Sequence, residues 1–237
     1  MKTLGIIGGL GPMATVYFME LIIKMTDVKT DQEHMRIYLQ SLPDTPDRTA
    51  YICGETDENP LPFFVKAGTS LSEQGADFIA IPCVTAQYFY KELSDNLDVP
   101  VIHLIEGLIK EIKANSIKKV GILATDGTIR SKLLQNQLID NGIDVIIPGQ
   151  EDQASIMDII YNQIKAGKPV NLSQFFEVVQ RLKKQGAEKL ILGCTELSLI
   201  KRDFKIDSDC IDVLDVLAKN TVLYSGAPLK KEYQELL

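Results

Sequence analysis

The sequence predicts a layered α/β fold made of two similar halves. Short β-branched runs alternate along the chain with longer segments of helical periodicity. This alternation is typical of βαβ units, in which helices cover parallel strands. Two stretches of the chain also repeat one another, and 237 residues with 45% hydrophobic content suffice for a large buried core.

The elements follow in order along the chain. In the first helix, Tyr17, Leu21 and Met25 recur at helical spacing. The expected strands are Leu4–Gly8, Met35–Gln40, Phe78–Cys83, Val99–His103, Lys119–Ala124, Asp144–Ile147, Lys189–Leu192 and Cys210–Val213. The expected helices are Pro12–Thr26, Leu61–Gln74, Tyr88–Asn96, Ile105–Asn115, Ile129–Asn141, Ser155–Ala166 and Leu172–Gln185.

An internal repeat relates the two halves. The motif Gln-Gly-Ala-acidic occurs at 74–77 and again at 185–188, and in both copies a cysteine lies eight residues after the glycine. These cysteines are Cys83 and Cys194, at an offset of 111 residues. A second pair of similar stretches, at 5–11 and 121–127, has an offset of 116. Two copies of one α/β unit account for both matches, although short turns of this composition also recur by chance.

The repeat gives the two cysteines a shared chemistry. Each would follow a parallel strand at its carboxyl end, where open α/β sheets bind ligands, so facing copies would bring both thiols to one cleft. Inverting an α-carbon needs a proton acceptor on one face and a proton donor on the other. A thiol with a reference pKa of about 8.5 can serve as either. Thr85 and Thr195 follow the cysteines, where hydroxyl and backbone N–H groups can hold a carboxylate.

At these residues the chain resembles the aspartate/glutamate racemase family, and in particular its aspartate racemase branch. The resemblance extends over most of the chain and rests on five short motifs in the expected order. They are Gly8-Gly9-Leu10-Gly11-Pro12-Met13-Ala14-Thr15, Pro46-Asp47-Arg48-Thr49, Ile81-Pro82-Cys83-Val84-Thr85-Ala86, Leu123-Ala124-Thr125-Asp126-Gly127-Thr128 and Leu192-Gly193-Cys194-Thr195-Glu196.

The resemblance implies a racemase that interconverts L- and D-aspartate, or a related acidic amino acid, without cofactor or metal. It implies two pseudo-symmetric Rossmann-like or flavodoxin-like domains, here 1–99 plus 213–237 and 100–212, with the active site between them, and a homodimer. Cys83 and Cys194 would be the catalytic pair. By the same resemblance Arg48 would bind the side-chain carboxylate of the substrate, since a guanidinium can grip a carboxylate through two hydrogen bonds. The remaining substrate-binding residues would be Met13, Thr49, Thr85, Thr125, Tyr161, Lys165 and Thr195.

Two positions depart from the family pattern. Val84 follows the first cysteine where the family usually has asparagine, and Gln87 stands where the branch commonly has histidine. Val84 offers no amide to the substrate. Two alternatives therefore stay open: a substrate more apolar than aspartate, or a protein that binds an amino acid without turning it over. Gln87 can still donate a hydrogen bond but cannot transfer protons.

Other interpretations of the sequence remain. The Gly-x-Gly-x-x-Ala stretch at 9–14 fits a dinucleotide-binding turn, but Pro12 lacks an N–H there and the second strand ends without the ribose-binding acid. A non-catalytic amino-acid sensor and a related isomerase of the superfamily are the further alternatives. The two matched cysteines favour racemisation over decarboxylation by a single proton donor.

Composition excludes several classes of partner. The net charge of −7 argues against nucleic-acid binding, which needs clustered Lys and Arg. No segment has the length and hydrophobicity of a membrane span, and no signal-peptide pattern precedes the first strand, so we expect a cytoplasmic protein. The cysteine and histidine spacings do not indicate a metal site. Cys53 and Cys210 are expected to be structural, because neither has a positive setting that would activate a thiol.

Overall fold

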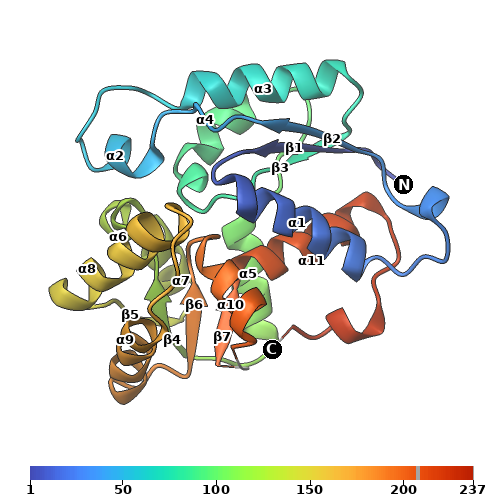
Figure 1. The fold of residues 1–237 in the computed structure, drawn as a ribbon. Helices are drawn as coiled ribbons and strands as arrows, with labels where there is room; N and C mark the ends of the chain where they lie inside the picture. Colours follow the sequence, from blue (N-terminus) through green and yellow to red (C-terminus); the bar gives the residue numbers. More distant parts are fainter. Residues whose placement is uncertain (207–208, 237) are drawn as a thin grey trace.

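Two parallel sheets lie on either side of a central layer of helices (Figure 1). The computed structural model describes residues 1–206 and 209–236. The first sheet has the strand order β2-β1-β3 and the second the order β5-β4-β6-β7. The strands are β1 (Leu4–Gly8), β2 (Ile37–Ser41), β3 (Phe78–Ala80), β4 (Lys119–Leu123), β5 (Asp144–Ile146), β6 (Lys189–Leu192) and β7 (Cys210–Asp212). The predicted α/β class with parallel sheets is confirmed.

The helices connect and cover these strands. They are α1 (Pro12–Met25), α2 (Arg48–Ile52), α3 (Leu61–Glu73), α4 (Tyr90–Asp95), α5 (Leu104–Ala114), α6 (Asp126–Ser131), α7 (Leu133–Asp140), α8 (Gln150–Asp158), α9 (Leu172–Lys184), α10 (Leu197–Phe204) and α11 (Val213–Ser225). Three short 3₁₀ helices, η1 (Asp31–Glu33), η2 (Thr85–Phe89) and η4 (Lys231–Tyr233), and a π-helical segment, η3 (Ile159–Ile164), complete the structure.

The sequence repeat corresponds to a structural repeat. In both copies a glycine with positive φ follows the helix: Gly75 has φ 98° and Gly186 has φ 96°. A left-handed residue here ends the helix and turns the chain into the next strand. Two residues later, the backbone N–H of Asp77 donates to Thr3 at 2.8 Å, and that of Glu188 donates to Lys119 at 2.9 Å. Each copy is therefore anchored in the same way beside the central strand of its own sheet.

A shared hydrophobic core joins the two sheets. Helices α1, α5 and α11 lie between the sheets, and their buried side chains form one cluster with residues of β1, β3, β4 and β6. Within it Leu4, Ile122 and Leu217 have no exposed surface. Two further clusters lie on the outer faces, one under α3 and one under α8 and α9. Because the central cluster includes strands of both sheets, the relative placement of the two sheets is fixed by packing.

The structure differs from the predicted elements in several places. The expected strand Val99–His103 is reduced to one bridge, in which Val101 pairs with Ile79. The expected helix 129–141 is two helices, because Lys132 between them has the left-handed conformation. The expected helix 155–166 begins earlier and changes to η3 at Ile159. Helices α2, α10 and α11 were not predicted. In the described part of the chain, no helix combines the length and the apolar character needed to cross a membrane.

Candidate active site

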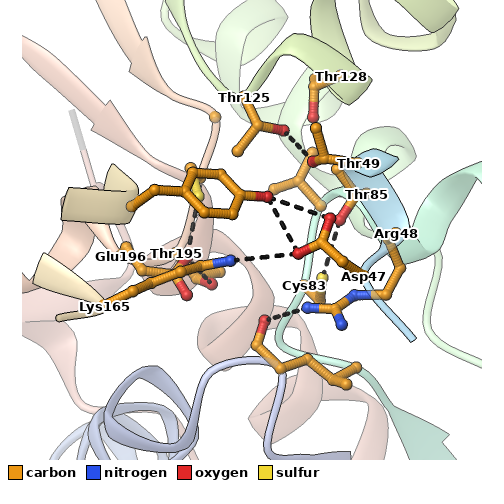
Figure 2. Close-up of a pocket in the computed structure, with 15 residues that line it drawn as sticks. Asp47, Arg48, Thr49, Cys83, Thr85, Thr125, Thr128, Lys165, Thr195 and Glu196 are labelled. Atoms are coloured by element: carbon orange, nitrogen blue, oxygen red, sulfur yellow. Dashed lines mark hydrogen bonds and ion pairs between the residues drawn. The ribbon is translucent and has the colours of Figure 1, made fainter. Parts of the chain in front are cut away.

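A small pocket lies where segments that follow strands of both sheets converge (Figure 2). Its cavity volume is about 10 Å³, room for about one water molecule. An amino acid can therefore enter only if the lining side chains or the two halves move apart. The lining residues are Leu10, Asp47, Arg48, Thr49, Cys83, Val84, Thr85, Thr125, Thr128, Tyr161, Lys165, Gly193, Cys194, Thr195 and Glu196.

Cys83 lies beside a buried cation. It follows β3, and its Sγ is 3.2 Å from the Thr85 hydroxyl. The guanidinium of Arg48, at the start of α2, is only 7% exposed and donates to the backbone carbonyls of Thr45, Pro46 and Leu10. Burial opposes the charged form of Arg48, but the nearby Cys83 sulfur and the Asp47 carboxylate outweigh it and raise the pKa of Arg48. Cys83 is thus the cysteine of the pocket that has a guanidinium beside its sulfur.

Cys194 has the opposite electrostatic setting. Its Sγ donates to Oε2 of Glu196 at 2.9 Å, and both side chains are buried. Burial first, and then the Glu196 carboxylate, raise the pKa of the Cys194 thiol well above its ordinary value, whereas Lys165 opposes this shift. Cys194 is therefore a thiol in this state of the protein. Its charged neighbour is the carboxylate of Glu196, whereas the charged neighbour of Cys83 is the guanidinium of Arg48.

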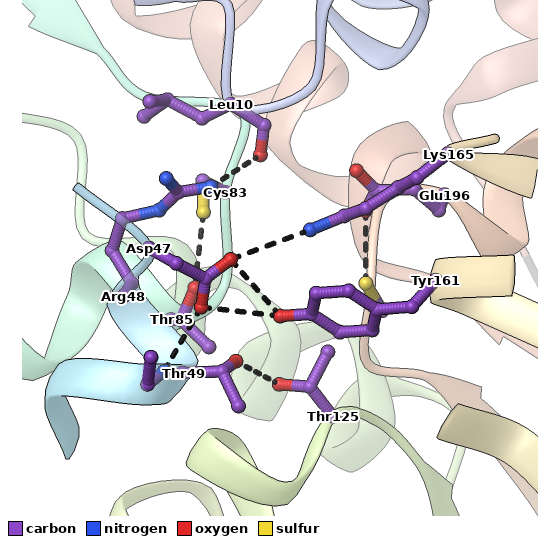
Figure 3. A network of polar contacts seen from close by, with 12 residues as sticks. Leu10, Asp47, Arg48, Thr49, Cys83, Thr85, Thr125, Tyr161, Lys165 and Glu196 are labelled. Carbon is purple, nitrogen blue, oxygen red and sulfur yellow. Dashed lines mark hydrogen bonds and ion pairs between the residues drawn. The ribbon is translucent and has the colours of Figure 1, made fainter. Parts of the chain in front are cut away.

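Asp47 lies between these two sides of the pocket (Figure 3). Its carboxylate accepts from the Tyr161 hydroxyl at 3.1 and 3.2 Å and lies 3.9 Å from Lys165 Nζ. It also caps α2 by accepting from the Ala50 backbone N–H. Burial would raise the pKa of Asp47, but the Ala50 N–H, Lys165, Arg48 and Tyr161 together hold it below its ordinary value. Asp47 is thus an anion that partly neutralises the cations of the pocket.

The π-helical segment η3 brings Tyr161 and Lys165 together. The Lys165 Nζ lies 4.0 Å from the centre of the Tyr161 ring, a cation–π contact. Burial disfavours the charged form of Lys165, but Glu196 and Cys194 raise its pKa. Burial also raises the pKa of Tyr161 to about 12. Lys165 is therefore a charged group on the Cys194 side, and Tyr161 is a neutral hydrogen-bond donor.

Hydroxyl groups link the two halves around the pocket. The Thr49 hydroxyl on α2 bonds the Thr125 hydroxyl before α6 at 3.0 Å. The Thr195 hydroxyl donates to the Pro82 carbonyl beside Cys83 at 3.2 Å. Both bonds are buried, and the second one directly joins the two cysteine segments.

The structure brings together all the predicted site residues except Met13. The Met13 side chain is 54% exposed and lines a neighbouring open hollow of about 440 Å³. Met13 is one residue into α1, which directs its side chain outward from the first turn. Gln87 lies outside the pocket as well, because its Oε1 accepts from the Leu104 backbone N–H and so serves the start of α5.

Three further polar residues of the pocket were not predicted as site residues. They are Asp47, Thr128 and Glu196. All three lie within or at the end of the motifs that suggested the site, directly next to or close to an expected site residue. Sequence position alone could have flagged them, but their orientation into the pocket depends on the turns between strand and helix.

The glycine-rich loop before α1 is covered on one side by the segment after β2 and borders the open hollow of about 440 Å³ on the other. A Cβ built on Gly9 would lie 2.4 Å from the backbone nitrogen of Leu42, so this loop packs against the segment after β2. Among residues 1–206 and 209–236, no group of three His, Cys, Asp or Glu side chains is placed to hold a metal ion.

Comparisons with known proteins identify the family of the chain. Residues 7–221 match the family described as Asp/Glu/Hydantoin racemase. The chain belongs to this family. The chain is also similar to the broad specificity amino-acid racemase RacX of Bacillus subtilis, with 31% identity over 92% of this chain and 96% of that protein. The family resemblance expected from the motifs is thereby confirmed.

Solved structures of the family have the same fold. The aspartate racemase of Picrophilus torridus is 30% identical, with a TM-score of 0.85 over 99% of this chain and 98% of that one. Glutamate racemase isoform RacE1 of Bacillus anthracis is 18% identical, with a TM-score of 0.67 over 95% of this chain and 83% of that one, which shows a common fold alone. The predicted two-part racemase fold is confirmed.

Proposed function

We propose that this protein is a cofactor-independent amino-acid racemase that uses Cys83 and Cys194 as its two proton-transfer groups. One observation carries the proposal: the two thiols come from matching positions of the repeat and line one pocket. Family membership supports the reaction class, and the different surroundings of the two thiols support a division of labour between them.

The reaction needs one thiolate and one thiol at a time. In one direction the Cys83 thiolate removes the α-proton, so that the Cα–H bond breaks and an S–H bond forms. The electron pair remains on the α-carbon and is delocalised into the substrate carboxylate. The Cys194 thiol then gives its proton to the opposite face and becomes the thiolate. In the reverse direction the two cysteines exchange these roles.

Hydroxyl groups of the pocket would stabilise the carbanion. Negative charge grows on the α-carboxylate of the substrate as the α-proton leaves, so donors aimed at that carboxylate lower the barrier. Thr85 and Thr195 lie beside the two cysteines and are the donors that we assign to it. We assign the binding of a side-chain carboxylate to Arg48 and Lys165, with Tyr161 as a further donor.

The substrate we propose first is aspartate, with glutamate and neutral amino acids as a broader alternative. The buried guanidinium of Arg48 and the partly exposed ammonium of Lys165 favour an acidic side chain, and the Picrophilus torridus relative is an aspartate racemase. Asp47 neutralises part of this positive charge, and Val84 presents an apolar surface to the pocket. The Bacillus subtilis relative is a broad specificity racemase. These observations favour a range of substrates over aspartate alone.

The test is proton exchange in deuterated water. Each enantiomer of aspartate, glutamate, alanine and homoserine is incubated with the protein, while loss of the α-proton is followed by NMR and inversion by optical rotation. We expect both to occur with at least one of these amino acids. A protein that binds an amino acid without exchanging its α-proton would instead be a sensor on this scaffold.

Cysteine variants separate the two proton transfers. In Cys83→Ala and Cys194→Ala, racemisation should fall by about 10²-fold or more, the lower range for loss of a general acid or base. Each variant should retain some exchange with only one enantiomer, and the two variants should differ in which one. Cys53→Ser is the matched control, because Cys53 is a half-buried thiol outside the pocket. Equal exchange of both enantiomers in either alanine variant would contradict the two-base assignment.

We also propose that the protein acts as a homodimer in the cytoplasm. Light scattering coupled to size-exclusion chromatography should give about twice the 26.4 kDa chain mass. A monomeric mass at the concentration of full activity would contradict the dimer.

A further inference from the structure

Glu196 has one carboxylate oxygen that finds no hydrogen-bond partner among the described residues. The side chain is 4% exposed, and its Oε2 accepts from the Cys194 thiol at 2.9 Å and lies 3.5 Å from the Thr195 hydroxyl. Its Oε1 is buried without a hydrogen-bond partner. A buried carboxylate oxygen in this state is unusual, because almost all such atoms in proteins have a donor.

The free oxygen lies beside the loop before α1, and Glu196 itself lines two cavities. Glu196 lines both the inner pocket and the open hollow beside it. A Cβ built on Gly11 would lie 3.0 Å from Oε1, so the loop before α1 leaves room in front of this atom only because residue 11 is glycine. Oε1 is therefore directed at the boundary between the pocket and its opening.

The neighbouring charges leave Glu196 available for a cation. Lys165 lies close enough to interact electrostatically with Glu196, but its ion pair is with Asp47, at 3.9 Å. Arg48 donates to backbone carbonyls and lies beside Cys83. The other titratable group that faces this side is Tyr161, a neutral donor. Asp47 and Glu196 supply negative charge and Arg48 and Lys165 supply positive charge, which suits a ligand that carries both signs.

We propose that Oε1 of Glu196 binds the α-ammonium group of the substrate, while Oε2 keeps its hydrogen bond with the Cys194 thiol. This role deepens the proposed racemase function and rests on the same pocket. It makes Glu196 a substrate-binding residue and restricts the ligand class to compounds with an ammonium group next to the carboxylate. Hydroxy acids and simple carboxylic acids are excluded from tight binding.

The contact has a consequence for the reaction. In the free protein the Glu196 carboxylate opposes formation of a thiolate at Cys194. An ammonium bound to the same carboxylate offsets that negative charge, so the proton of Cys194 is held less tightly when substrate is present. The substrate itself therefore prepares Cys194 to act as the base for the enantiomer whose α-proton faces it.

The binding test compares ligands that differ only in the ammonium group. Calorimetry gives Kd for aspartate against succinate and for alanine against propionate, in the wild type, Glu196→Gln and the control Glu73→Gln on an exposed face of α3. We expect at least a tenfold preference for the amino acid in the wild type and in Glu73→Gln. In Glu196→Gln that preference should shrink about tenfold. An unchanged preference in a folded Glu196→Gln protein, or no preference in the wild type, would overturn the proposal.

A second measurement does not depend on how Glu196→Gln folds. In Cys83→Ser, the ultraviolet absorbance of the thiolate is titrated with pH in saturating aspartate and in saturating succinate. Thiolate formation at Cys194 should occur at lower pH with aspartate, and equal midpoints would overturn the proposal. Exchange of the α-proton by the wild type is measured alongside. If the α-proton exchanges but ligands with an ammonium group are not preferred, the role proposed for Glu196 is wrong and the racemase function stands. If such ligands are preferred but the α-proton does not exchange, the racemase function is wrong and the role of Glu196 in binding stands.

Discussion

We expect Asp212 to contribute to the pH dependence of the free energy of unfolding, and Asp212→Asn to remove that contribution. Asp212 ends β7 and caps α11, and its Oδ1 accepts from the Leu214 backbone N–H at 2.9 Å and from the Ser198 hydroxyl at 2.5 Å. Its Oδ2 is buried without a partner. Burial first, and then the nearby Asp215 carboxylate, raise the pKa of Asp212 to about 7, although Lys201 opposes the shift.

The direction of the effect follows from proton binding. The folded protein keeps the Asp212 proton up to about pH 7, whereas the unfolded chain loses it near its ordinary pKa of 3.8. Between these values the unfolded state binds fewer protons, so the free energy of unfolding falls as pH rises. Above the folded pKa this contribution changes no further. Two pH units within this window correspond to about 2.7 kcal/mol, and relaxation around the ionised group reduces this to roughly 1–3 kcal/mol.

Urea unfolding at pH 5 and pH 8 measures this contribution. Asparagine keeps the helix cap and cannot ionise. Between pH 5 and pH 8 the free energy of unfolding of the wild type should therefore fall by about 1–3 kcal/mol more than that of Asp212→Asn. Exposed Asp140, at the end of α7, provides the control Asp140→Asn, which should follow the wild type. Parallel pH dependence of the wild type and Asp212→Asn would refute a raised pKa at this site. The urea m-values must also agree, because a change in them would indicate a different unfolded state.

Three further substitutions test the pocket. Val84→Asn should lower the free energy of unfolding by about 1–3 kcal/mol, since it places an amide in the central core. It should also lower KM for aspartate, and an unchanged KM would show that residue 84 does not contribute to substrate recognition. Gly127→Ala would place a Cβ 2.9 Å from the Thr49 Cα, so we expect thermal unfolding to show a free energy of unfolding about 1–3 kcal/mol lower, together with slower α-proton exchange. The control Gly149→Ala places its Cβ in open space and should change neither quantity. Asp47→Ala should be less stable than Asp47→Asn by about 1 kcal/mol in urea unfolding, because only asparagine keeps the α2 cap, and equal stability would show that the cap contributes nothing.

Much of the fold follows from local patterns in the sequence. The strands of both sheets are short apolar runs, and helices such as α3 and α9 have an apolar face that local spacing reveals. The repeat identified Gly75 and Gly186, whose positive φ values end a helix in each half. Helix α2 was missed because it is five residues long and begins in a Pro- and Asp-rich segment, where the Asp47 cap sets its start. Helix α11 was missed because it is buried on most sides and has little amphipathic contrast.

Most of the residues that line the pocket could be predicted from the sequence, because each cysteine motif follows a strand of its own parallel sheet at the carboxyl end, where such sheets bind ligands. The charge states and partners of those residues depend on the three-dimensional structure. Arg48 beside Cys83, Glu196 on Cys194 and Asp47 between Tyr161 and Lys165 are contacts set by the way the turns orient side chains. Electrostatic interactions change steeply over a few ångströms and with burial, so spacing along the chain cannot supply them.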